Sequence, residues 1–270
     1  MLGKLLKHDF IATWKVPVIL DAALIVLGIM TAGLTQTIPH LEGSFSMTLF
    51  TFSYLGFYYI GIIATNVVTL IFLVIRYYRN LYTSEGYLTF TLPVHTDLIV
   101  LSKVITGTVW LALCYFSTFV SVTIAGASFL KAAGADFSAV LEGITDVFQV
   151  FGFGQPGFTP ILLLLILLTP FAAILSMYFS VSIGQLWQNH KVLGTVLCII
   201  ALYIANQFVT QFAMLGSGFW QMIGSGADAD DWFARIYRNM LLIICITTMA
   251  QSVVYFLVCL VINRKKVNLN

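Results

Sequence analysis

Six long apolar segments limit the folds that this 270-residue chain can adopt. Each is close to the roughly 20 residues that a helix needs to cross the hydrocarbon core of a bilayer. Runs such as residues 160–171, PILLLLILLTPF, lack the alternating pattern of a transmembrane strand, so a β-barrel is excluded. The sequence therefore predicts an all-α, polytopic membrane protein. Its expected spans are residues 16–34, 47–75, 104–130, 159–183, 192–214 and 239–262.

The composition points the same way, because only 9% of the residues are charged and 60% are hydrophobic. A soluble domain carries about 25% charged residues, so this chain cannot cover itself with a water-facing surface. No internal repeat stands out, and we expect a single transmembrane domain over residues 1–270. All four cysteines fall within the spans, which favours small core residues over a disulfide framework.

The distribution of Lys and Arg predicts the orientation, since these residues gather on the cytoplasmic side of membrane proteins. With six spans, one side carries ten of them and the other side carries three. The ten are Lys4, Lys7, Lys15, Arg76, Arg79, Lys103, Lys191, Arg264, Lys265 and Lys266, and the three are Lys131, Arg235 and Arg238. We therefore expect both termini to lie in the cytoplasm.

Residues 1–15, MLGKLLKHDFIATWK, have the pattern of an amphipathic helix that lies on the inner membrane surface. Its apolar stripe consists of Leu2, Leu6, Phe10 and Trp14, which are four residues apart. Pro17 suits the first turn of a helix, so we expect the chain to break there before the first span. The alternative is a cytoplasmic extension of that span.

Two outer segments have helical features. In residues 131–158, Asp136 can cap a helix with apolar residues on one side, and a turn follows at residues 152–157. Residues 215–238 mix Trp and Phe with Gly and acidic residues. This mixture fits a short re-entrant or half-membrane helical pair, and it fits a plain outer loop equally well.

A polar loop at residues 76–103 concentrates charges, turn residues and helix caps between the second and third spans. Gly86 permits a turn, and Pro93 ends the short amphipathic element that follows it. Thr96 is a good N-cap and Asp97 suits the positive first turn of a helix, so the chain is expected to restart a helix there.

The middle of this loop offers three aromatic side chains, Tyr82, Tyr87 and Phe90. Aromatic anchors of this kind are what a groove on a partner protein engages. Composition alone leaves two interpretations open: a docking surface, or an interfacial hairpin that only connects two spans.

The run YRNLYTSEGYLTFTLPVHTDLIVLSK, residues 78–103, resembles the cytoplasmic loop of small bacterial ABC exporter permeases, the Gram-positive type that works with a separate ATPase. The start, MLGKLLKHDFIAT, is similar to the N-terminus of the same proteins. The resemblance implies a six-span type V exporter fold with a coupling helix between spans 2 and 3. It also implies a connecting helix at residues 1–15 and a re-entrant helical pair at residues 215–238.

In that family the coupling helix sits in a cleft of the ATPase. Carried over to this chain, the ATPase contacts would be Arg79, Asn80, Tyr82, Glu85, Gly86, Tyr87, Phe90, Thr91 and Pro93. The implied partners are two copies of the ATPase subunit and a second copy of the permease or a related permease, in a bacterial plasma membrane. No nucleic acid is expected among them.

The chain lacks the G-x-x-x-x-G-K-[ST] phosphate loop, so we do not expect it to be an enzyme. It is expected to bind no cofactor, because ATP and Mg²⁺ would bind to the partner ATPase. The four histidines, His8, His40, His95 and His190, have no Cys or carboxylate at metal-ligand spacing, and no catalytic motif is present.

Polar residues inside the spans are candidates for a transport pathway. They are Asp21, Asn66, Asn206, Gln207 and Gln211. Asp21 either pairs with Lys15 or lines a path, and the amides either contact substrate or join helices through hydrogen bonds.

The function that this sequence predicts is export of a peptide, a lipid or a hydrophobic drug-like molecule. Two alternatives remain open: a non-transporting sensor or immunity module that recruits a cytoplasmic partner, and a self-sufficient carrier or channel. The spans lack a file of charged residues, which argues against a proton- or ion-coupled carrier.

Overall fold

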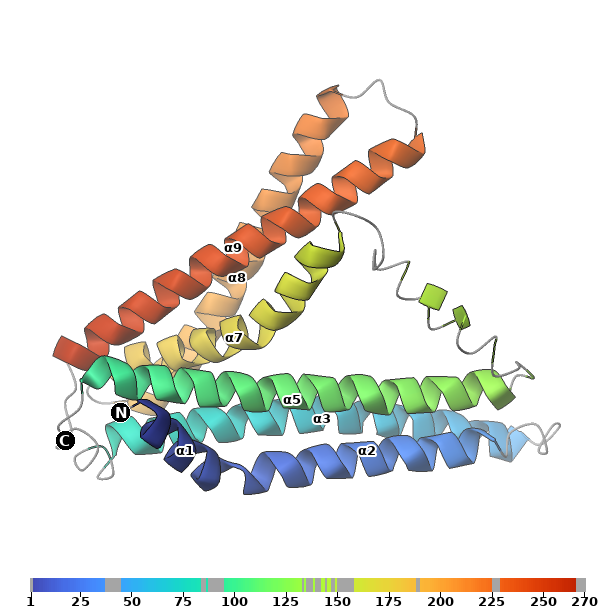
Figure 1. Ribbon diagram of the computed structural model, residues 1–270, viewed down its shortest axis with the longest axis horizontal. Helices are drawn as coiled ribbons and strands as arrows, with labels where there is room; N and C mark the ends of the chain where they lie inside the picture. Colours follow the sequence, from blue (N-terminus) through green and yellow to red (C-terminus); the bar gives the residue numbers. More distant parts are fainter. Residues whose placement is uncertain are drawn as a thin grey trace. The chain divides into compact units, whose positions relative to one another are not determined.

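The computed structural model describes residues 2–36, 45–83, 86, 95–132, 134, 138, 142–143, 145–146, 149, 158–187, 190–224 and 229–265. Seven α-helices carry most of these residues, and the described part of the chain contains no strand, which confirms the all-α prediction (Figure 1). The helices are α1 (Leu2–Thr13), α2 (Lys15–Thr35), α3 (Phe45–Tyr82), α5 (Thr96–Ala132), α7 (Thr159–Gly184), α8 (Lys191–Gly224) and α9 (Ala229–Lys265).

Six of these helices are long and apolar enough to cross a membrane, and they coincide with the six predicted spans. The segments are Lys15–Thr35, Phe52–Tyr82, Thr96–Ala132, Thr159–Gly184, Lys191–Gly216 and Tyr237–Arg264. The chain is therefore a multi-pass membrane protein.

Two of the helices reach further than the hydropathy of the sequence predicted. α3 has 38 residues and α5 has 37, and a rise of about 1.5 Å per residue makes each much longer than the hydrocarbon core, which is about 30 Å thick. Consequently α3 continues to Tyr82 and α5 starts at Thr96, so both ends of the polar loop are helical. Asp97 lies in the first turn of α5, as predicted.

The break between the N-terminal helix and the first span is confirmed. α1 ends at Thr13, α2 begins at Lys15, and the two helices run in different directions (Figure 1). Pro17 lies in the first turn of α2 and has no N–H, so it cannot donate a hydrogen bond to the carbonyl of Thr13 four residues earlier. The proline therefore accounts for the end of the regular hydrogen-bond ladder.

The helices pack in two compact units. The first unit consists of Met1–Leu6, Val74–Thr108 and Gly152–Asn270, and in it α7, α8 and α9 contact one another. The second unit consists of Lys7–Leu73 and Val109–Phe151, where α2, α3 and α5 lie side by side (Figure 1). The sequence predicted one membrane domain, and helices α3 and α5 run from one unit into the other.

Residues 215–238, expected on the outer side, are helical where the structure describes them. α8 continues without a break to Gly224 and α9 begins at Ala229, so residues 215–224 and 229–238 extend the two spanning helices. A plain loop is therefore wrong for these residues, whereas their helical structure agrees with the alternative of a helical pair, whose re-entry into the membrane stays a prediction. Asp136 and residues 152–157 lie outside the described residues.

Candidate coupling site and polar clusters

Five buried polar and aromatic side chains from three helices meet in the first unit. They are Tyr77 and Tyr82 of α3, Tyr178 and Ser182 of α7, and Asn263 of α9, and none is more than 7% exposed. We call these five residues the tyrosine network. Burial at this level leaves no water to satisfy the polar atoms, so each depends on a partner within the protein.

Hydrogen bonds join the network into one directed chain. The Tyr82 hydroxyl donates to Asn263 Oδ1 at 2.7 Å, and Asn263 Nδ2 donates to the Tyr77 hydroxyl at 3.2 Å. The Ser182 hydroxyl donates to the Tyr178 carbonyl at 2.8 Å. Because that bond uses the only hydroxyl proton of Ser182, we assign Tyr77 as the donor in its 3.2 Å contact with Ser182. α3, α9 and α7 are thus connected through buried polar groups.

Ring packing fixes the positions of the same residues. The ring of Tyr77 stacks on that of Tyr178, with centroids 3.9 Å apart and an interplanar angle of 7°. The Tyr82 ring meets Tyr77 edge-on, with a centroid distance of 6.1 Å. Gly107 of α5 leaves room for this arrangement, because a Cβ atom there would lie 2.7 Å from the Tyr178 hydroxyl. The network is therefore held by both packing and hydrogen bonds.

An ion pair joins the start of α5 to the end of α9. Arg264 Nε donates to Asp97 Oδ1 at 2.7 Å, and a second bond runs from Arg264 Nη2 to Asp97 Oδ2. Both side chains are exposed, by 58% and 36%, so this pair orients the helix ends more than it stabilises them. Asn263 and Arg264 are neighbours, so adjacent residues of α9 bind Tyr82 and Asp97, which lie on either side of residues 83–95 of the polar loop.

The structure describes four of the nine predicted ATPase contacts. Arg79 is exposed and Asn80 is half-buried, while the N–H of the buried Gly86 donates to the Thr83 carbonyl at 2.8 Å. Tyr82 needs a correction, because its ring is 7% exposed and its hydroxyl binds Asn263. It packs inside this chain and does not offer its ring to a partner.

The other five predicted contacts lie outside the described residues. They are Glu85, Tyr87, Phe90, Thr91 and Pro93.

In the second unit, Asn66 joins helices. Its Nδ2 donates to Thr118 Oγ1 of α5 at 3.0 Å and to the Ile62 carbonyl of its own helix at 2.9 Å. Its Oδ1 lies 3.6 Å from Cys114 Sγ, which is also on α5. These contacts favour the packing interpretation of Asn66 over contact with substrate.

Asp21 does not pair with Lys15. Asp21 is 9% exposed and its carboxyl group lies against the Cys114 thiol of α5, while Lys15 is exposed. Asp21 therefore faces the interior of the α2–α3–α5 bundle.

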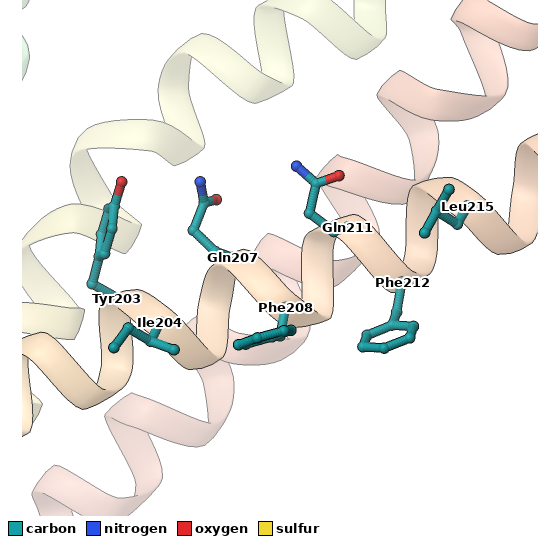
Figure 2. A pocket seen from close by; sticks show the side chains of 7 residues that line it. All are labelled: Tyr203, Ile204, Gln207, Phe208, Gln211, Phe212 and Leu215. Carbon is teal, nitrogen blue, oxygen red and sulfur yellow. The ribbon is translucent and has the colours of Figure 1, made fainter.

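The three polar residues of the fifth span do not share one face. Asn206 accepts a hydrogen bond from the Tyr255 hydroxyl of α9 at 2.5 Å, so it joins two helices. Gln207 and Gln211 are exposed and line an open hollow of about 330 Å³ on α8 (Figure 2). The other lining residues are Tyr203, Ile204, Phe208, Phe212 and Leu215.

No family model, no curated protein and no solved structure matches this chain. The features of the molecule that bear on its function are therefore the polar contacts and the loop at residues 76–103.

Sequence reasoning missed Tyr178, Ser182 and Asn263 as members of a site. A signal was available, because Tyr178 and Ser182 are four residues apart on α7, as are Cys259 and Asn263 on α9. Residues at this spacing lie on one face of a helix, so polar pairs inside an apolar span mark a contact with another helix.

Proposed function

We propose that this chain is the membrane-spanning permease subunit of an ATP-driven ABC exporter. The observation that carries the proposal is the attachment of the polar loop: Tyr82 before it and Asp97 after it bind the adjacent residues Asn263 and Arg264 of α9. A loop that only connects two spans needs no such attachment to a third span. A loop that must transmit a push from a partner does need it.

In this proposal the ATPase docks on residues 83–95 and moves them when it binds ATP. Tyr82 transmits the movement to α9 through Asn263, and Tyr77 transmits it to α7 through Ser182. Hydrogen bonds between buried groups suit this role, because breaking one leaves a polar atom without a partner in an apolar interior. The three helices therefore shift together and do not slide past one another.

The partner supplies the chemistry. The chain has no phosphate loop, so ATP and Mg²⁺ would bind to two copies of a separate ATPase subunit. The excess of Lys and Arg on one side supports a cytoplasmic position for that docking loop and both termini. The proposed membrane is the plasma membrane of a bacterial cell.

A second permease subunit, either another copy or a related chain, would complete the pathway. Gln207 and Gln211 support this part of the proposal, because they are exposed within a span. An amide that faces lipid lacks hydrogen-bond partners, whereas one that faces a pathway or another helix has them. The aromatic and apolar side chains around the two amides fit a peptide, a lipid or a hydrophobic drug-like substrate better than an ion.

The proposal is tested by purifying the tagged chain from its native membranes in mild detergent and measuring ATP hydrolysis. We expect an ATPase with a phosphate loop to co-purify, and we expect Tyr87→Ala to reduce the hydrolysis that substrate stimulates. Tyr59→Ala is the matched control for the same change of side chain, at an exposed position of α3 that belongs neither to the loop nor to the hollow on α8. Purification without any ATPase, or equal effects of the two substitutions, contradicts the proposal.

A further inference from the structure

The Asp21 carboxyl group is buried, and no cation among the described residues accompanies it. Asp21 is 9% exposed, and its Oδ1 atom has no hydrogen-bond partner and almost no contact with solvent. Within the described residues, the titratable side chain in contact with it is Cys114 of α5. α3 contributes the neutral Asn66 and Thr69, whose oxygens lie 3.6 and 3.7 Å from the same Cys114 sulfur.

A negative charge is costly at such a place. A carboxylate accepts up to about four hydrogen bonds, whereas a carboxylic acid has one donor and needs fewer acceptors satisfied. Burial without a counter-ion normally leaves an acid in its neutral form. The surroundings of Asp21 therefore fit a carboxylic acid better than a carboxylate.

The proton on Asp21 decides how the neighbouring hydrogen bonds run. When Asp21 is neutral, its O–H donates to Cys114 Sγ, and the thiol proton is free to donate to Asn66 Oδ1. Asn66 Nδ2 then donates to Thr118 Oγ1 at 3.0 Å, and the Thr118 hydroxyl donates to the Cys114 carbonyl at 2.9 Å. The result is one chain of donors that passes from α2 to α5, to α3 and back to α5.

When Asp21 loses its proton to solvent water, that chain breaks at one place. The Cys114 thiol must donate to the carboxylate, so Asn66 Oδ1 loses its donor. The contact between α3 and α5 is then weaker, and α2 carries an unpaired charge inside the bundle.

We propose that Asp21 is a proton-binding site inside the α2–α3–α5 bundle and that release of the proton loosens the packing of α2 and α3 against α5. The site makes the second unit sensitive to pH, whatever the loop at residues 76–103 binds. It goes beyond the proposed transport function, and its test needs no ATPase.

The test is infrared spectroscopy of the full chain in lipid nanodiscs, recorded as the pH is raised. We expect a carboxylic C=O stretching band at neutral pH that Asp21→Asn removes and that disappears from the wild type as the pH rises. The S–H stretching band of Cys114, identified by its loss in Cys114→Ala, should shift at the same pH. Asp97→Asn is the control, because Asp97 is an exposed acid paired with Arg264, and it should leave the carboxylic band unchanged.

A second measurement keeps the proposal testable if a band is weak. Asp21→Asn resembles the neutral acid in shape and can still donate to Cys114, so this variant should fold. The folding equilibrium of the wild type should fall as the pH rises, by at most about tenfold per pH unit for one proton, and that fall should be absent in Asp21→Asn. A carboxylic band that persists in Asp21→Asn, or the same pH dependence in both proteins, overturns the proposal.

Discussion

The hydrogen bond between Tyr82 and Asn263 makes the sharpest prediction about stability. Asn263→Ala removes the acceptor of the Tyr82 hydroxyl and the donor to Tyr77, which are two contacts between α9 and α3. Hydrogen bonds between membrane helices contribute about 0.6 kcal/mol on average and up to about 1.7 kcal/mol. Two of them give an expected loss of about 1–3 kcal/mol. The loss should lie toward the lower end of this range, because the Tyr82 hydroxyl can turn toward Ser182 Oγ, 3.0 Å away.

The assay is a double-mutant cycle on reversible unfolding in mixed micelles, followed by circular dichroism. Asn263→Ala and Tyr82→Phe are measured singly and together, and we expect a coupling energy of about 0.6–1.7 kcal/mol. The control cycle replaces Tyr82→Phe by Tyr78→Phe, since the Tyr78 ring lies 6.2 Å from the Tyr82 ring. The reasoning is refuted if the two cycles give equal coupling energies.

Two further predictions concern packing and surface charge. Gly28→Ala should destabilise the protein by about 1–3 kcal/mol, because the added Cβ would meet Ser121 Oγ at 2.4 Å, whereas Gly33→Ala, with nothing within 4 Å, should be neutral or stabilising in thermal unfolding. Equal effects of these two substitutions would contradict the packing of α2 against α5. Arg264→Ala should change stability very little and should abolish any salt dependence that comes from the exposed pair with Asp97, as measured by unfolding at low and high salt. A large loss of stability that salt does not change would show that the pair does more than orient the helix ends.

The membrane-spanning fold could be predicted because hydropathy acts over whole segments. Each span needs about 20 apolar residues, and substitution of single polar residues does not hide such a run. The break at Pro17 was also predictable, since the missing N–H is a property of the residue itself. Hydropathy did not give the ends of α3 and α5, because Tyr82 and Thr96 lie in polar sequence, and the start of α5 was predicted instead from the capping residue Thr96 and from Asp97 in the first turn.

The candidate site could be predicted only in part. The loop was visible as a local excess of polar residues, but the partners that fix it, Ser182 and Asn263, lie 100 and 181 residues away from Tyr82. A single sequence does not reveal which residues that are far apart in the chain contact each other in the fold. Tyr82 was misread for this reason: an aromatic residue beside a loop suits a docking surface and a buried contact equally well.

The polar residues of the spans show the same limit. Asn66 and Asn206 join helices, whereas Gln207 and Gln211 are exposed. Asn206 and Gln207 are adjacent, and a step of one residue turns a helix by about 100°, so they point to different surroundings. Periodicity shows which residues share a face of a helix, but it does not show which face packs against another helix and which face is exposed.

The central claim is that residues 83–95 bind an ATPase, and site-specific photocrosslinking tests it most directly. A photoreactive amino acid replaces Tyr87 in cells that make the chain, and the crosslinked protein is identified by mass spectrometry. The same amino acid at Tyr203, an exposed position of α8, is the control. We predict that the Tyr87 position crosslinks to a protein that carries a G-x-x-x-x-G-K-[ST] phosphate loop and that the Tyr203 position does not. Crosslinks from Tyr87 to lipid alone, or to proteins without a nucleotide site, would contradict the account.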